Sequence, residues 1–167
     1  MGLKTGLPPR AGAGTRLLIL GSLPGDVSLA LRQYYGHPQN QFWRLMGAVL
    51  GEPLDSCGYD ERLVRLASRG VGLWDVVARA RRPGSLDAAM SEIDANELDA
   101  FTRSLPELRA IAFNGGAAAR IGRRQLAGRE DLVMIGLPSS SPAYAAMTFE
   151  AKLVRWASLR PFVLPPP

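Results

Sequence analysis

Four short apolar runs recur along the chain, separated by longer segments of mixed polarity. A continuous apolar run of this length is typical of a strand buried on both faces of a parallel sheet. The runs predict strands over residues 16–20, 71–77, 109–113 and 131–135.

The segments between these strands have the composition of helices, with one exception. Residues 79–96 carry Arg, Pro, Gly and Ser and predict a long irregular connection. Alternating strands and helices indicate an α/β fold with a mainly parallel sheet. Helices are predicted over residues 26–32, 42–50, 59–68, 97–104, 117–126 and 148–159.

The domain organisation follows from the ends of this pattern. Residues 1–14 are rich in Gly and Pro, which predicts a loose, flexible N-terminal tail. Residues 15–163 carry all predicted elements with no repeat or linker, as expected of a single domain, and 164–167 form a short C-terminal tail.

Three segments of small and polar residues directly follow predicted strands. They are GSLPG at 21–25, FNGG at 113–116 and LPSSSP at 137–142. Ligands of parallel sheets bind at the carboxyl ends of the strands, so we expect a site where these segments meet. GSLPG lacks the Gly-Lys-Ser/Thr ending of a phosphate-binding P-loop and is not a dinucleotide fingerprint; alone it could be a tight turn.

Net charge and composition limit the kinds of molecule that this protein is expected to bind. The chain of 167 residues has a formal net charge of +5 and a sequence pI of about 10.0. A basic protein favours a polyanion, most often nucleic acid, although an arginine-rich coding bias would give the same balance. The N-terminus lacks the apolar core of a signal peptide and no run is long enough to span a membrane, so we expect a cytoplasmic protein.

The sole cysteine, Cys57, and the sole histidine, His37, limit the chemistry. They cannot form an internal disulfide, an ordinary structural zinc site or a four-thiolate cluster. No acidic cluster indicates a Mg²⁺ site. We therefore expect no metal and no cofactor. A serine hydrolase is a weak rival, because there is no G-x-S-x-G elbow and His37 is the only histidine base for Ser22 or Ser140.

The densest polar and aromatic segment is YYGHPQNQFW, residues 34–43. Aromatic rings stack on nucleobases and amides read base edges. We favour core positions for Phe42 and Trp43, whereas Asn40 could either contact a ligand or cap a helix. Two similar ambiguities occur at strand ends. Asn114 could bind a ligand or close a turn, and residues 139–141 could hold phosphates or form a serine-rich turn.

The ordered series GSLPG, YYGHPQNQFW, GLWDVV, RPGSLD, FNGGAA and LPSSSPA resembles the hypoxanthine-DNA glycosylase branch of the uracil-DNA glycosylase superfamily. The resemblance extends from about residue 17 to about residue 155, and HP-x-N-x-FW is its most specific part. It implies a three-layer α/β/α sandwich around a short, mainly parallel four-stranded sheet. It also implies cofactor-free hydrolysis of the N-glycosidic bond of a flipped-out base in DNA.

The same resemblance implies roles for individual residues. Asn40 would be the catalytic residue, holding a water molecule against C1′ with its amide oxygen. Tyr35 would stack on the base, the backbone of Ser22 would line its pocket, and Asn114 would read its edge. The phosphates and the duplex would be held by Ser139, Ser140, Ser141 and, as a wedge, Tyr144.

Two positions depart from the wider superfamily. Leu23 stands where relatives have a water-activating Asp or Asn, and Leu137 where many have His or Asn. The hypoxanthine branch is similar in lacking both groups. His37 either contacts the base or a phosphate, or it is a structural residue of the HP turn. Asp26 is an alternative to Asn40 as the group that orients the water molecule.

The interpretation is therefore a monomeric DNA repair glycosylase for hypoxanthine, with weaker activity on uracil as an open point. Two alternatives remain at this stage. One is a uracil or mismatch glycosylase on the same scaffold. The other is a module that binds DNA lesions without turnover, since two usual catalytic groups are absent.

Overall fold

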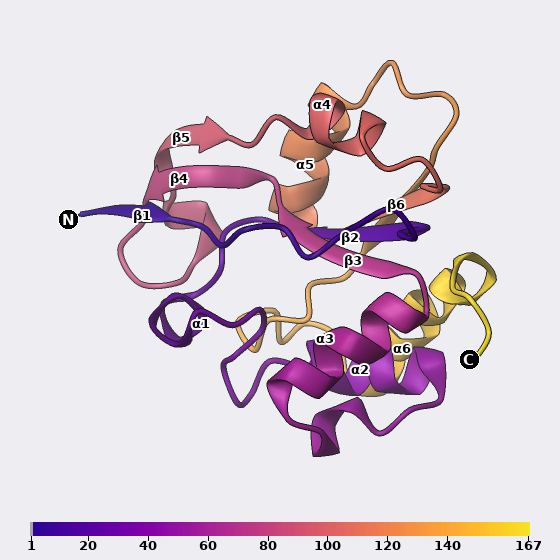
Figure 1. Ribbon diagram of the computed structural model, residues 1–167. Coiled ribbons are helices and arrows are strands. Elements are labelled where there is room, and N and C mark those ends of the chain that lie inside the picture. Colours follow the sequence, from indigo (N-terminus) through magenta and orange to yellow (C-terminus); the bar gives the residue numbers. More distant parts are fainter. Residues whose placement is uncertain (1) are drawn as a thin grey trace.

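The computed structural model describes residues 2–167, and a four-stranded parallel sheet forms its centre (Figure 1). The strand order is β3-β2-β6-β7. The chain therefore reverses its direction of travel across the sheet between β2 and β6, and the carboxyl ends of these two strands mark the usual ligand position. The strand bounds are Leu17–Gly21 for β2, Val71–Asp75 for β3, Ala110–Asn114 for β6 and Val133–Leu137 for β7.

Helices cover both faces of this sheet. Leu17 and Ile19 of β2 pack into one core, while Leu18 and Leu20 pack into the other. The first core is covered by α2 (Phe42–Leu50), α3 (Tyr59–Ser68) and α6 (Phe149–Trp156), and the second by α4 (Leu98–Arg103) and α5 (Gly116–Gln125), on opposite sides in Figure 1. The predicted three-layer α/β/α sandwich around a four-stranded parallel sheet is confirmed.

The predicted irregular connection at residues 79–96 is wrong. A second, antiparallel sheet with the order β1-β4-β5 includes this segment. Arg79 and Arg81 point away from the buried Ala80 and form ion pairs with Asp94 and Glu92 across the sheet. Because cross-strand charge pairs stabilise this ribbon, its strands lack the apolar signal of the central sheet. Their bounds are Leu3–Thr5 for β1, Val77–Arg81 for β4 and Ser91–Ala95 for β5.

The N-terminal segment also differs from the expected loose tail. Met1 lies outside the described residues, but residues 3–5 form β1 on the edge of β4, and Arg10 pairs with Leu73 through two backbone hydrogen bonds of 2.8 and 2.9 Å. Leu7 is buried in the first core. The segment is ordered because it completes the hydrogen bonds of two strand edges.

The remaining helices are short. They are α1 (Asp26–Leu31) and the 3-10 turns η1 (Leu54–Ser56), η2 (Asp87–Ala89) and η3 (Ala157–Phe162). At the C-terminus, Leu164 exchanges hydrogen bonds with Arg69, so part of the expected tail is attached to the domain. Among residues 2–167 there is no helix both long and apolar enough to traverse a lipid bilayer.

Candidate active site

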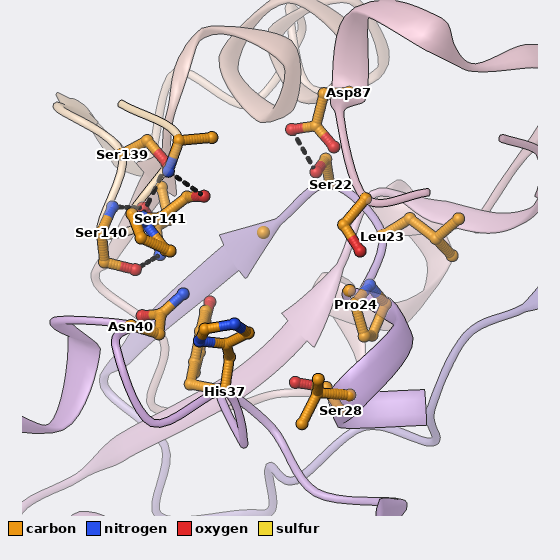
Figure 2. Close-up of a pocket in the computed structure, with 18 of the residues that line it drawn as sticks. Ser22, Leu23, Pro24, Ser28, His37, Asn40, Asp87, Ser139, Ser140 and Ser141 are labelled. Carbon is orange, nitrogen blue, oxygen red and sulfur yellow. Dashed lines mark hydrogen bonds between the residues drawn. The ribbon is translucent and has the colours of Figure 1, made fainter. Parts of the chain in front are cut away.

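A cavity of about 280 Å³ lies at the carboxyl edge of the parallel sheet. Its walls come from the ends of β2, β3 and β6, from the segment after β7, and from the segments at residues 22–28, 34–40 and 85–87, which include the start of α1 and of η2. Figure 2 shows the labelled side chains facing one another across this space, with Asn40 and His37 opposite Ser22 and Asp87. The three segments that follow predicted strands therefore meet in one place.

Most residues singled out in the sequence line this cavity. Tyr144 is the exception: it is 39% exposed and lines a neighbouring groove with Arg120. That groove shares Ser139 and Ser141 with the cavity, so the two spaces adjoin each other along the serine segment. The predicted residues in the cavity wall are Ser22, Asp26, Tyr35, His37, Asn40, Asn114, Ser139, Ser140 and Ser141.

Asn114 is held rigidly at the end of β6. Its amide oxygen accepts a hydrogen bond from the backbone N–H of Ser140 at 2.9 Å, and its amide nitrogen donates to the Ser140 hydroxyl at 2.9 Å. Both residues are buried. The pairing fixes which amide atom faces which way, and Asn114 lines the cavity with its amide held in this orientation.

Asn40 lies directly before Gln41, the N-cap residue of α2. Its amide oxygen accepts a hydrogen bond from the backbone N–H of Phe42 at 3.0 Å, at the start of α2. Its amide nitrogen points toward the cavity (Figure 2). The helix start therefore orients the amide, and a ligand or water meets its N–H₂ group and the free lone pair of its oxygen.

His37 lies on the cavity wall beside Asn40 (Figure 2). Its Nδ1 atom accepts a hydrogen bond from the backbone N–H of Gln39 at 3.1 Å. This bond assigns the ring proton to Nε2. Neither candidate serine is paired with His37, because Ser22 donates to Asp87 at 2.7 Å and Ser140 pairs with Asn114. This arrangement gives no support to a serine hydrolase.

Tyr35 adopts a left-handed backbone conformation with φ of 53°, which is uncommon for a residue other than glycine. Its ring stacks on Phe42, with centroids 3.9 Å apart. Phe42 and Trp43 are both buried in the first core, as the sequence interpretation has them. One face of the Tyr35 ring is thus occupied by the protein, and its hydroxyl is buried without a hydrogen-bond partner.

Asp75 is a site residue that sequence analysis missed. It ends β3, lines the cavity and is only 3% exposed. Burial raises the pKa of its carboxyl group well above the usual value; Asp87 raises it further and Arg82 opposes the shift. The strand predicted at residues 71–77 placed Asp75 inside it, whereas β3 ends at this residue; a carboxylate within the otherwise apolar segment GLWDVV was the available signal.

Arg82 positions the loop after β2. Its guanidinium is fully buried and donates hydrogen bonds to the carbonyls of Leu23, Pro24 and Gly84, at 3.0, 2.7 and 3.0 Å. It also lies 3.6 Å from Asp87. One side chain therefore connects GSLPG to the segment at residues 84–87.

We expect Arg82→Met to lower the free energy of unfolding by about 3 kcal/mol, because the buried carbonyls of Leu23 and Pro24 lose their charged donor. Urea denaturation measures this change. Arg79→Met is the matched control, since its ion pair with Asp94 is exposed and should contribute less than about 1 kcal/mol. Equal losses in the two variants would contradict this role of Arg82.

Asp26 and the serine segment both form ion pairs or hydrogen bonds within the protein. The Asp26 carboxylate pairs with Lys4 at 2.6 Å at the rim. Ser139 accepts a hydrogen bond from the backbone of Ser141, whose hydroxyl accepts one from the backbone of Ala143. These bonds form a serine-rich turn, and the same turn presents its surface to both the cavity and the groove.

Lys152 of α6, also missed in the sequence, connects the wedge candidate to the HP-x-N-x-FW segment. It is buried and donates to the side-chain oxygen of Gln41 at 2.9 Å, and its ammonium lies 5.4 Å from the centre of the Tyr144 ring. Among residues 2–167, no group of three or more His, Cys, Asp or Glu side chains is arranged to hold a metal ion.

Comparison with known proteins identifies the family. The model of the uracil DNA glycosylase superfamily matches residues 8–160. The chain belongs to this superfamily. Leu23 lines its cavity and Leu137 lies in its first core, so apolar side chains occupy the two positions that depart from the superfamily pattern.

Two relatives are named hypoxanthine DNA glycosylase. The relative from Methanosarcina barkeri is 45% identical over 112 residues, which are 67% of this chain and 71% of that protein. The relative from Methanosarcina acetivorans is 41% identical over 116 residues, or 70% and 73% of the two chains. These matches confirm the family resemblance found in the sequence.

A solved structure is similar over nearly the whole chain. It is a solution NMR structure from Methanosarcina acetivorans, described as a candidate uracil DNA glycosylase. It is 36% identical, aligns with a TM-score of 0.86, and the alignment covers 96% of this chain and 99% of that one.

Proposed function

We propose that this protein is a DNA repair glycosylase that hydrolyses the N-glycosidic bond of hypoxanthine in DNA. Membership of the superfamily and the two relatives confirm the coarser prediction, an enzyme that removes deaminated bases from DNA. The preference for hypoxanthine is supported by the relatives' names and by the HP-x-N-x-FW segment at the cavity. The observation that carries the proposal is the placement of Asn40 and Asn114 in one cavity.

The cavity has the size and the chemistry for one nucleobase. Its volume of about 280 Å³ is near the lower end of the roughly 300–1,000 Å³ typical of small-molecule pockets. A base must leave the duplex to enter it, which requires a few kcal/mol of unstacking and unpairing, least at a mispair. Deaminated bases form such mispairs.

In the proposed reaction Asn114 binds the edge of the flipped base, and Ser140 keeps the Asn114 amide in the required orientation. Asn40 holds a water molecule near C1′ of the sugar. The sugar acquires oxocarbenium character as the base departs, so a well-placed water needs little activation to attack C1′. Donors at the base edge stabilise the negative charge that develops on the leaving base.

The DNA backbone would follow the serine segment. Ser139 and Ser141 line both the cavity and the groove of Tyr144, and Arg120 adds a positive charge to that groove. Hydroxyl groups, backbone N–H groups and arginine are the usual partners of phosphates. We also propose that the enzyme acts as a monomer, because a single domain carries the residues that line the cavity. A cytoplasmic location is proposed because the substrate is DNA.

The test is single-turnover cleavage of labelled duplexes that contain hypoxanthine, uracil, xanthine or no lesion, with EDTA present and alkali added to reveal abasic sites. We expect cleavage at hypoxanthine, unaffected by EDTA. Cleavage only at uracil would overturn the proposed preference. Binding without cleavage at any lesion would favour the lesion-binding module, and a loss of activity with EDTA would reveal a metal requirement.

A further inference from the structure

Two buried polar groups lie close to Gly21 in the wall of the cavity. The Asp75 atom Oδ2 and the Tyr35 hydroxyl are both buried and neither makes a hydrogen bond within the described residues. Gly21 lies between them: a Cβ atom built on Gly21 would be 2.6 Å from Asp75 Oδ1 and 3.2 Å from the Tyr35 hydroxyl. All three residues line the cavity, so the absence of a side chain at Gly21 leaves the Asp75 carboxyl next to the space for a base.

Buried polar groups of proteins are rarely left unpaired, and an unpaired one lowers stability. The Asp75 main chain is used, since its carbonyl accepts a hydrogen bond from Asn96 at 2.8 Å. Its side chain has no comparable structural contact. A carboxyl group that lacks a partner in the free protein and borders a ligand cavity is therefore a candidate to bind the ligand.

We propose that Asp75 binds the flipped base in its protonated form and donates its proton to the base as the glycosidic bond breaks. This inference rests on the proposed function and adds a general acid to it. Asn40 and Asn114 cannot supply a proton in this way, because amides do not titrate near neutral pH.

The charged and titratable groups around Asp75 favour the neutral carboxyl. Burial is the largest effect, and the carboxylate of Asp87 from η2 raises the pKa of Asp75 further. Arg82 lies on the other side and lowers it. The neighbouring phenols of Tyr34 and Tyr35 have pKa values raised by burial and by Asp75, so they stay neutral.

The proposed step is balanced as a hydrolysis. The bond between C1′ and N9 of the purine breaks, and its electron pair goes to the ring. The Asp75 proton moves to N7, so hypoxanthine leaves as a neutral molecule. The water oxygen bonds to C1′, and the proton that water loses returns, through solvent, to the Asp75 carboxylate.

The experiment compares the wild-type protein with Asp75→Asn in single-turnover cleavage of a hypoxanthine duplex over a range of pH. The amide keeps the shape of the protonated carboxyl and can donate a hydrogen bond, but it cannot transfer a proton. General acids typically contribute 10²–10⁴-fold, so we expect a loss of about 10²-fold or more. The wild-type rate should fall as pH rises through the pKa of Asp75, and this fall should be absent from the variant.

The control is Asp60→Asn, an exposed aspartate of α3 outside the cavity, which should keep the wild-type rate and pH profile. Every other titratable group of the site is still present in Asp75→Asn, and burial still raises the pKa values of Tyr34 and Tyr35, so the difference between its profile and that of the wild type reports on Asp75. Equal rates and profiles for wild type and Asp75→Asn would overturn the inference while leaving the glycosylase proposal intact. A wild-type protein that cleaves no lesion would instead overturn the proposed function.

A second measurement uses only the wild-type protein and so does not depend on whether a variant folds. Carbon-13 NMR of the side-chain carboxyl groups in the wild-type protein follows Asp75 directly. We expect its resonance to remain that of a protonated acid at pH values where exposed aspartates, with an ordinary pKa of about 3.9, are ionised. Titration of Asp75 together with the exposed aspartates would overturn the inference.

Discussion

Asn40→Ala should abolish most hypoxanthine cleavage while leaving the fold and DNA binding in place. In the proposed mechanism the Asn40 amide places the attacking water, and misplacement of a reacting group by about 1 Å can lower a rate by about 10²-fold. We expect a loss of at least this size in the single-turnover rate. Affinity for the same duplex, measured by fluorescence anisotropy, should change little, because the serine segment and the groove are untouched.

A structural effect of the substitution can be separated from a catalytic one. Asn40→Ala also removes the hydrogen bond to the Phe42 N–H, which should lower the free energy of unfolding by about 1 kcal/mol. Asn40→Asp keeps an acceptor for that N–H but replaces the amide nitrogen facing the cavity with an oxygen. Thermal unfolding should therefore be restored in Asn40→Asp.

The rate of Asn40→Asp distinguishes two ways of holding the water. If the amide nitrogen of Asn40 holds the water, cleavage by Asn40→Asp stays slow. If the free lone pair of the amide oxygen holds it, the cleavage rate of Asn40→Asp recovers together with its thermal stability. A wild-type rate in Asn40→Ala would contradict any catalytic role for this residue. Such a result would direct attention to Asp26, whose carboxylate also borders the cavity but is paired with Lys4.

The central sheet was predictable because each of its strands is buried on both faces. Leu17 to Leu20 form a continuous apolar run for this reason, with alternate residues in the two cores. The helix predicted at residues 59–68 has the same bounds as α3, and that at 42–50 the same bounds as α2. Long amphipathic or fully buried segments give a strong local signal.

The small antiparallel sheet was not predictable in the same way. Residues of β5 are mostly exposed, and β4 presents Arg79 and Arg81 to solvent and to acidic partners. The strand β1 has three residues and is defined by its pairing with β4. Such strands depend on contacts that are distant in the sequence, so local composition indicates a loop.

The residues of the candidate site also divide into those that the local sequence indicates and those that it does not. Asn114 and the serine segment were found because they follow strands, and Asn40 because its segment is distinctive. Asp75 and Arg82 were missed because their roles arise from burial. An aspartate at the end of a strand and an arginine in a polar segment are ordinary in sequence. Only packing reveals an unpartnered carboxyl or a guanidinium that binds three carbonyls.

Asn114→Ala should reduce cleavage by about 10²–10³-fold, the usual effect of removing one preorganised donor from a site where charge develops. The Asn114 amide is already oriented by Ser140, so it needs no rearrangement when the base enters. Because Asn114 is proposed to bind the base and not the backbone, discrimination between lesion and undamaged duplex should fall as well. Single-turnover rates and competitive binding measure the two effects.

Ser140→Ala tests whether that orientation matters. It removes the hydroxyl that accepts from the Asn114 nitrogen but keeps the backbone N–H that donates to the oxygen. One of the two restraints on the Asn114 amide remains, so we expect a loss of about tenfold, smaller than that of Asn114→Ala. If Ser140→Ala were as slow as Asn114→Ala while folding normally, the serine hydroxyl itself would have to contact the DNA. If Asn114→Ala kept the wild-type rate and selectivity, the base would be read by other groups of the cavity.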